Sequence, residues 1–299
     1  MKKVSFIFVA LMGMMAASCG NESDELSNEQ TVEQSQLVPV RVHVEGFSLL
    51  QEEFSGAQTR AAQDVADYSG INAVMLAFYK VDGTEVYKST QAKGDADFGE
   101  FSLSLPMGSY TMVAVAYYNS DASPLALTSP TAAAFTGTRA YETFATTQAV
   151  NITNTSAVDI SATLNRIITQ LKVVSSDGKT ADVSNVRMTF SAGGKDFNPT
   201  TGFAITNTGF ANTVSNSASV GSTSTSLSFL FLATDEQNIN VTIETLDADG
   251  NTLLSKTVNN VPFKRNRVTK LTGAMYTNEA LSGTFQVETA WLDEYSANF

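Results

Sequence analysis

Cysteine, histidine and tryptophan each occur only once in the 299 residues of the chain, as Cys19, His43 and Trp291. A single cysteine excludes a disulfide within the chain and a zinc site built from several cysteines. A single histidine leaves no histidine pair for a metal and nearly excludes a Ser-His-Asp set. The sequence also contains no glycine-rich phosphate loop. These absences argue against an enzyme, a cofactor and a bound metal.

Charged residues are scarce as well, at 16% of the chain, and their signs are unbalanced. The 18 Lys and Arg face 30 Asp and Glu, which gives a net charge of −12. A body this acidic repels phosphate backbones, so nucleic-acid binding is disfavoured. The hydrophobic content of 43% is that of a folded protein, and the length is sufficient for two domains.

The first 19 residues have the layout of an export signal. Two lysines precede an apolar run, Val4–Met15, and three small residues stand directly before Cys19. The run is too short for a membrane-spanning helix. The ending AASC resembles a bacterial lipobox, in which the chain is cut before the cysteine and the thiol receives a lipid. We therefore expect residues 1–18 to be a lipoprotein signal peptide and Cys19 to carry the lipid, with a buried or accidental cysteine as the alternative.

Residues 19–36 follow as an acidic, polar stretch with Leu26 as the one large apolar residue. Such a composition predicts a disordered tether. Glu22, Asp24 and Glu25 resemble the surface-export signal of Bacteroidetes lipoproteins, and ordinary linker acidity explains them equally well. The expected location is the outer membrane, on the cell surface.

From residue 37 onward, hydrophobic alternation predicts an all-β body. Val38, Val40, Val42 and Val44 alternate with other residues in the period-two pattern of a half-buried strand, which places His43 on the polar, exposed face. Residues 121–145 are expected to form a loop with a short helix. Further strands of this half are predicted at Ile71–Tyr79, Glu85–Thr90, Phe101–Leu105, Tyr110–Tyr118 and Thr147–Ile152.

The second half is predicted to begin near Asn154. Residues 162–174 fit either a helix or two strands, and residues 207–226 read as a polar loop. Both halves contain a hairpin with an Asp-Gly turn and then a proline-containing turn before a long strand. This shared order indicates two tandem β-sandwich domains, residues 37–153 and 154–299. Strands are predicted at Val186–Ser191, Leu227–Leu232, Ile239–Leu246, Thr252–Val258, Arg267–Tyr276 and Thr284–Trp291.

Two acidic groups could bind calcium in principle. Asp95, Asp97 and Glu100 share one loop, and Asp247 and Asp249 precede a glycine. Turn chemistry accounts for Asp and Gly in the second group without a metal. We expect no metal site.

One position outside the strands is chemically distinctive. Arg60 and Ala61 lie in the polar stretch QTRAA after the first strand, where an accessible arginine suits a trypsin-like protease. An ordinary loop arginine is the alternative interpretation.

These features converge on one family. The lipobox, the TRAA stretch, INAVMLAFYKVDGTEV, LPMGSYTMVAVAYYN, LNRIITQLKV and VPFKRNRVTKLTGAMY resemble the fimbrillin-like subunits of type V pili of Bacteroidales. The resemblance covers the chain after residue 37 and rests on strand patterns. It implies two transthyretin-like β-sandwiches in a fimbrial (pilus) subunit that supports cell adhesion.

The resemblance also implies a mechanism of assembly. In stalk subunits an Arg-specific protease removes the first strand, and the C-terminal strand of the next subunit fills the groove that remains. Carried over, the cut falls between Arg60 and Ala61, and the removed strand's inward face is that of the four valines. The donor face is Phe285, Val287, Thr289 and Trp291. Anchor or tip subunits, and a surface glycan-binding lipoprotein, are the alternatives.

Replacing Cys19 by alanine is expected to block lipidation, because no other thiol exists to accept the lipid. Palmitate labelling in cells measures this directly, with Ser18→Ala as the control that keeps a small residue before the cysteine. Palmitate incorporation that persists in Cys19→Ala would contradict the lipoprotein prediction.

Overall fold

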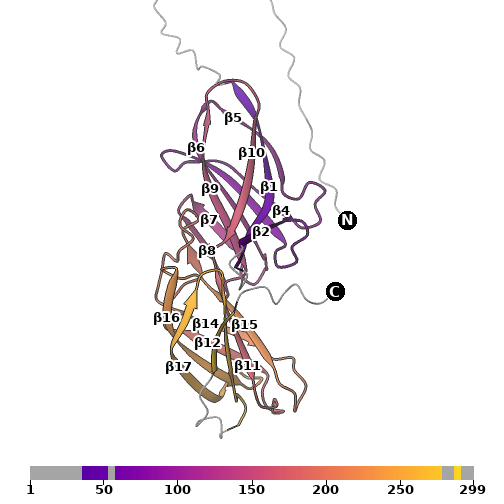
Figure 1. The fold of residues 1–299 in the computed structure, drawn as a ribbon, viewed down its shortest axis with the longest axis vertical. Coiled ribbons are helices and arrows are strands. Elements are labelled where there is room, and N and C mark those ends of the chain that lie inside the picture. Colours follow the sequence, from indigo (N-terminus) through magenta and orange to yellow (C-terminus); the bar gives the residue numbers. More distant parts are fainter. Residues whose placement is uncertain (1–35, 53–57, 278–285, 291–299) are drawn as a thin grey trace, which may run out of the picture. The chain divides into compact units, whose positions relative to one another are not determined.

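The computed structural model describes residues 36–52, 58–277 and 286–290, and every regular element among them is a strand (Figure 1). The predicted all-β fold is therefore confirmed. No helix in these residues is long and apolar enough to cross a membrane. The predicted signal peptide and nearly all of the predicted tether lie outside the described residues.

An eight-stranded sheet occupies the first half of the chain. Its strand order is β2-β1-β10-β9-β6-β3-β4, and β5 pairs with β1. The pair β1–β10 is parallel and the other pairs are antiparallel. The strands are β1 (Leu37–Glu52), β2 (Gln58–Gln63), β3 (Ala73–Lys80), β4 (Glu85–Ala92), β5 (Glu100–Pro106), β6 (Gly108–Tyr117), β9 (Thr143–Ile152) and β10 (Val158–Arg166).

This sheet folds over itself into two layers. Strands β9 and β10 pair only at Asn165–Ala145 and Arg166–Phe144. Inward side chains of β1, β5 and β10 then pack on those of β3 and β6 in one buried cluster. We call this cluster the first core. The arrangement is that of a β-sandwich whose layers meet at the β9–β10 corner.

Strands β3 and β6 are apolar on both faces because both faces are covered. One face of β3 joins the first core, and the other face, with Ala77 and Tyr79, joins a second core. A three-stranded sheet, β13-β8-β7, contributes to the second core. Its strands are β7 (Leu125–Ser129), β8 (Ala132–Phe135) and β13 (Asp196–Phe197).

The expected loop with a short helix at 121–145 was wrong. The segment holds the hairpin β7–β8 and the beginning of β9. Ala133 and Phe135 alternate with more exposed neighbours and are 2% exposed. An alanine-rich composition suggested helix, but packing against the second core outweighs this weak local preference.

The second half of the chain contains two four-stranded sheets, with orders β15-β11-β18-β19 and β14-β12-β16-β17. Buried side chains from both sheets form a third core. This half is therefore also a β-sandwich. Its strands are β11 (Thr169–Ser175), β12 (Asn185–Phe190), β14 (Phe210–Ser215), β15 (Thr225–Leu230), β16 (Glu236–Leu246), β17 (Thr252–Lys264), β18 (Val268–Gly273) and β19 (Gln286–Ala290).

Residues 162–174 form two strands, the second of the two predicted alternatives. The helical spacing of their apolar residues arises because these residues pack, one after another along the chain, into three different cores. Leu164 lies in the first core, Ile167 and Ile168 lie in the second, and Leu171 lies in the third. Since β10 pairs with β1 and β9, the chain leaves the first sheet between Arg166 and Thr169, later than the expected change at residue 154.

Two other expectations for the second half were wrong. The polar segment 207–226 contains β14, which pairs with β12 and places Asn212, 1% exposed, in a hydrogen bond to Ser228 Oγ at 2.8 Å. The predicted turn at Pro262 lies inside β17. Proline is tolerated there because β17 is an edge strand, which pairs with β16 and with no other described strand.

Candidate functional site: the first strand and the cluster at its end

Strand β1 is held on both sides by other strands. Val40 pairs with Leu103 of β5 and with Val158 of β10, and Val42 pairs with Phe101 and Ile160. Strand β5 runs antiparallel to β1, whereas β10 runs parallel to it. Removing β1 would therefore free one backbone edge on each side. We call the space that β1 fills between β5 and β10 the β1 groove.

The four valines of β1 point into the first core. Val38, Val40, Val42 and Val44 are at most 1% exposed, and burying one such side chain is worth roughly 1.5–3 kcal/mol. Arg41, between two of them, and Glu45, after the last, are exposed. His43 is exposed as predicted, and its Nδ1 contacts Glu100 Oε1. One face of β1 thus supplies packing and the other faces solvent.

A β-bulge follows the last valine. Val44 pairs with Ala162 while Gly46 pairs with the next residue of β10, so Glu45 has no partner on β10. Gly46 has φ 143°, which a glycine adopts readily. Before the bulge the inward-facing residues have even numbers. The extra residue shifts the alternation by one, so Phe47 faces inward. Alternation in the sequence alone did not predict that Phe47 faces inward. Gly46 was the available signal of a bulge before it.

Phe47 occupies an aromatic pocket. It is fully buried, with its ring centroid 3.9 Å from that of Phe144 and 5.3 Å from that of Tyr68. Opposite it on β10 is the buried Leu164. We call the space lined by Tyr68, Phe144 and Leu164 the Phe47 pocket.

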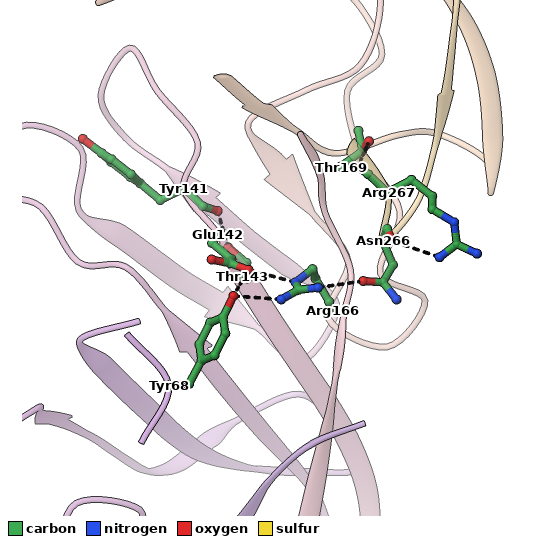
Figure 2. A network of polar contacts seen from close by, with 8 residues as sticks. All are labelled: Tyr68, Tyr141, Glu142, Thr143, Arg166, Thr169, Asn266 and Arg267. Atoms are coloured by element: carbon green, nitrogen blue, oxygen red, sulfur yellow. Dashed lines mark hydrogen bonds and ion pairs between the residues drawn. The ribbon is translucent and has the colours of Figure 1, made fainter. Parts of the chain in front are cut away.

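A buried ion pair lies against this pocket (Figure 2). Arg166 Nε is 2.9 Å from Glu142 Oε1, and their side chains are 6% and 12% exposed. The Arg166 guanidinium carbon lies 4.7 Å from the Phe144 ring centroid. Figure 2 shows the Arg166 side chain reaching toward Tyr68 and Glu142 on one side and Asn266 on the other.

Hydrogen bonds complete this polar network. Tyr68 Oη donates to Glu142 Oε1 at 2.6 Å and accepts from Arg166 Nη2 at 2.8 Å. Arg166 Nη1 donates to Asn266 Oδ1 at 3.1 Å, in the turn between β17 and β18. We call these four residues the Arg166 cluster. It connects the end of the first sheet with the turn that begins β18.

Burial raises the pKa of the Tyr68 hydroxyl far above its usual range, and the adjacent Glu142 carboxylate raises it further. The hydroxyl therefore stays protonated and serves as a donor at every physiological pH. The Arg166 cluster supplies position and cohesion for the Phe47 pocket, with no nucleophile in it.

Arg60 and Ala61 lie in strand β2, which pairs with the far end of β1. Arg60 pairs with Leu50 and Ala61 pairs with Leu49. A loop was expected here, and the structure has a strand instead. Because β2 ends the sheet order, one of its backbone edges has no neighbour among the described strands of this sheet.

The candidate donor strand lies in its own sheet. In β19, Val287 pairs with Leu271 of β18, and Thr289 pairs with Thr269. Phe285 and Trp291 lie outside the described residues. Strand β19 ends its sheet order, so among the strands that the structure describes it pairs with β18 alone.

A carboxylate fixes the chain shortly before β19. Asp177 accepts hydrogen bonds from the backbone N–H groups of Met275 at 2.6 Å, Tyr276 at 2.7 Å and Thr277 at 3.1 Å. Tyr276 is 5% exposed, and its hydroxyl accepts from Asn216 Nδ2 at 2.7 Å. We call this set the Asp177 clamp. It holds residues 275–277 to the second sandwich independently of β19.

Asp95 and Asp247, one from each of the acidic groups considered for calcium, accept backbone hydrogen bonds in turns. Asp95 Oδ2 accepts the Ala92 N–H at 2.9 Å, and Asp247 Oδ1 accepts the N–H groups of Asp249 and Asn251. The Asn251 side chain and backbone lower the pKa of Asp247. Among the residues that the structure describes, no group of three His, Cys, Asp or Glu side chains could hold a metal ion.

Replacing Arg166 by methionine is expected to lower the free energy of unfolding by roughly 3–5 kcal/mol, because Glu142 would stay buried without its cation. Adding Glu142→Gln should recover part of this loss. Urea denaturation followed by circular dichroism measures both. The control is Lys264→Met, which breaks an exposed pair with Glu236 and should change stability little. An unaltered urea midpoint for Arg166→Met would show that the pair does not stabilise this corner.

Comparison with solved structures shows a shared fold. A candidate adhesin from Bacteroides ovatus has a TM-score of 0.50 at 10% identity, over 80% of this chain and 88% of its own. A second candidate adhesin from B. ovatus has a TM-score of 0.50 at 12% identity, over 85% of this chain and 92% of its own. A candidate polysaccharide-binding protein from Bacteroides thetaiotaomicron has a TM-score of 0.50 at 10% identity, over 86% of this chain and 99% of its own.

No curated protein matches the sequence. A family of unknown function, DUF6562, matches residues 40–298, and the chain therefore belongs to that family.

Proposed function

We propose that this protein is a structural subunit of a bacterial surface fimbria that polymerises by strand exchange and supports adhesion. The observation that carries this proposal is the position of β1. It lies inside the first sandwich, paired on both sides, yet it precedes Arg60 in the chain. One cut after Arg60 separates the whole of β1 from the rest of the protein.

Loss of β1 creates a binding site for another strand. It uncovers the apolar side chains of the first core that the four valines cover, and it frees the backbone groups of β5 and β10. Unpaired edges and exposed apolar surface favour addition of a strand from another chain. In such β-augmentation the backbone supplies affinity, and alternate side chains supply specificity.

Strand β19 is suited to be the donated strand. It is an edge strand that pairs with β18 alone within its sheet, and the Asp177 clamp fixes the chain before it. The C-terminal segment can therefore leave β18 while residues 275–277 stay in place. The partners are other pilus subunits, in a homo- or hetero-polymer, and an Arg-specific protease.

Lipidation at Cys19 places the precursor on the outer membrane before assembly. Several acyl chains on one residue hold a protein there firmly. The fold shared with two candidate adhesins of Bacteroides is compatible with this cell-surface role.

If β1 is removed for assembly, fimbrial material should begin at Ala61. N-terminal sequencing of polymers from the cell surface measures this. Arg60→Ala should leave chains that begin at Cys19 and do not polymerise. Arg41→Ala, which changes an exposed arginine of β1, is the matched control and should be processed as the native chain is. Polymer formation by Arg60→Ala at the native rate would contradict processing at Arg60.

Deleting residues 283–299 should abolish polymerisation and leave the monomer folded, because the Asp177 clamp and the third core remain. The melting temperature of the monomer and its entry into SDS-resistant ladders after protease treatment are the two measurements. Deleting only 292–299, which keeps β19, is the control. A truncated chain that still polymerises would rule out the C-terminal donor, and a monomer that unfolds would mean that β19 belongs to its own sandwich.

An anchor or tip subunit that keeps its lipid and its first strand is a variant of the same proposal, and surface chains that begin at Cys19 would favour it. A surface glycan-binding lipoprotein is the second candidate. One observation favours it: Tyr118 is 42% exposed, and its ring lies 5.3 Å from that of Tyr141. Aromatic faces of this kind can stack on sugars, and retardation in affinity electrophoresis with polysaccharide, lost in Tyr118→Ala, would support that function.

A further inference from the structure

We propose that the incoming C-terminal strand binds the β1 groove in one register, with Trp291 of a second copy in the Phe47 pocket and Thr289 opposite Ala162. This inference rests on the proposed strand exchange and deepens it. It commits to a single occupant of the groove, the C-terminal segment of another copy of this chain.

The groove has a fixed series of inward positions along β10. Val40 lies opposite Val158, Val42 opposite Ile160, Val44 opposite Ala162 and Phe47 opposite Leu164. Along β10 these partners are evenly spaced, two residues apart. In β1 the last step takes three residues because of the bulge at Glu45. A strand without a bulge would reach the same four positions at every second residue.

The C-terminal segment has this spacing. Phe285, Val287, Thr289 and Trp291 are two residues apart, and they end in the largest aromatic side chain. With Trp291 opposite Leu164, Thr289 falls opposite Ala162, Val287 opposite Ile160 and Phe285 opposite Val158. Two β-branched residues then replace Val42 and Val44 in the fully buried middle of the groove. The tryptophan replaces phenylalanine in the aromatic pocket.

The bulky Phe285 falls at a position that can accept it. Its neighbours would be Val158 of β10 and Leu103 of β5, both only partly buried. Extra volume causes less strain where the neighbouring side chains are partly exposed and can move than where they are fully enclosed. Val40, which Phe285 would replace, is 1% exposed like Val44, so the extra volume has to be taken up by movement of these two partly buried neighbours.

The direction of the strand follows from the two edges. Strand β10 pairs with β1 in parallel and β5 pairs with it antiparallel, and these ladders have different hydrogen-bond patterns. A replacement that runs in the same direction as β1 meets both edges as they stand. A reversed strand would need both edges to adjust, and it would place Val287 opposite Ala162.

The Phe47 pocket is prepared for an aromatic side chain. The rings of Tyr68 and Phe144 form its sides, and Arg166 lies over Phe144, held by Glu142. Aromatic partners gain from edge and offset contacts that an aliphatic side chain lacks. The pocket thus sets the register by accepting Trp291 and disfavouring the smaller residues of the segment.

Engineered disulfides test the register in chains cleaved at Arg60, which have lost Cys19 and therefore contain only the introduced thiols. The Thr289→Cys/Ala162→Cys variant should give a disulfide-linked ladder on non-reducing gels. Two matched controls, Val287→Cys/Ala162→Cys and Thr289→Cys/Leu164→Cys, should not. A ladder from the first control alone would report a reversed strand, whereas ladders from both controls would report a shift of two residues along β10.

Fluorescence of Trp291, the single tryptophan, provides an independent measurement. Its emission should move to shorter wavelength on polymerisation, and Phe144→Ala in the acceptor should reduce that shift. A ladder from either control pair without one from Thr289→Cys/Ala162→Cys would overturn the register while leaving strand exchange intact. Absence of SDS-resistant polymers from the cleaved native chain would instead overturn the proposed function.

Discussion

The pairing of β1 between β5 and β10 is the contact on which the first sandwich depends. Its four valines close the first core, and its backbone satisfies the edges of two other strands. A core strand is normally connected to its neighbours by short loops on both sides. Here β1 is the first of the strands that the structure describes, so a single cut downstream would separate it from the others. The same residues therefore complete the monomer and define the space that a second chain would have to fill.

The Arg166 cluster secures the corner where this strand ends. Arg166 closes the first sheet beside Phe144, and Asn266 connects it to the turn that begins β18. Buried ion pairs add little net stability compared with apolar packing, but they are strongly destabilising when one partner is lost. The cluster thus fixes the relative positions of the side chains at this corner. It holds the rings around Phe47 in the arrangement that any replacement strand must meet.

Strand β19 and the Asp177 clamp form the complementary arrangement in the second sandwich. Three backbone N–H groups converge on one carboxylate shortly before the strand begins. Because the chain is fixed there, the packing of the third core does not depend on the position of the C-terminal segment. A strand that pairs with one neighbour loses fewer hydrogen bonds on leaving than one paired on both sides, so β19 is held less firmly by backbone pairing than β1 is.

The sequence by itself determined the all-β class, most strands, the inward valines of β1 and the exposed His43. It could do so because period-two alternation reports one buried and one exposed face. The tertiary structure decided the features that depend on distant partners. The bulge that turns Phe47 inward, the alanine-rich hairpin β7–β8, the polar strand β14 and the burial of Arg166 all arise from contacts between segments far apart in the chain. Local composition contains no record of those contacts. For the same reason, residues 162–174 were ambiguous in sequence, because their apolar side chains face three different cores, and only the packed structure separates them.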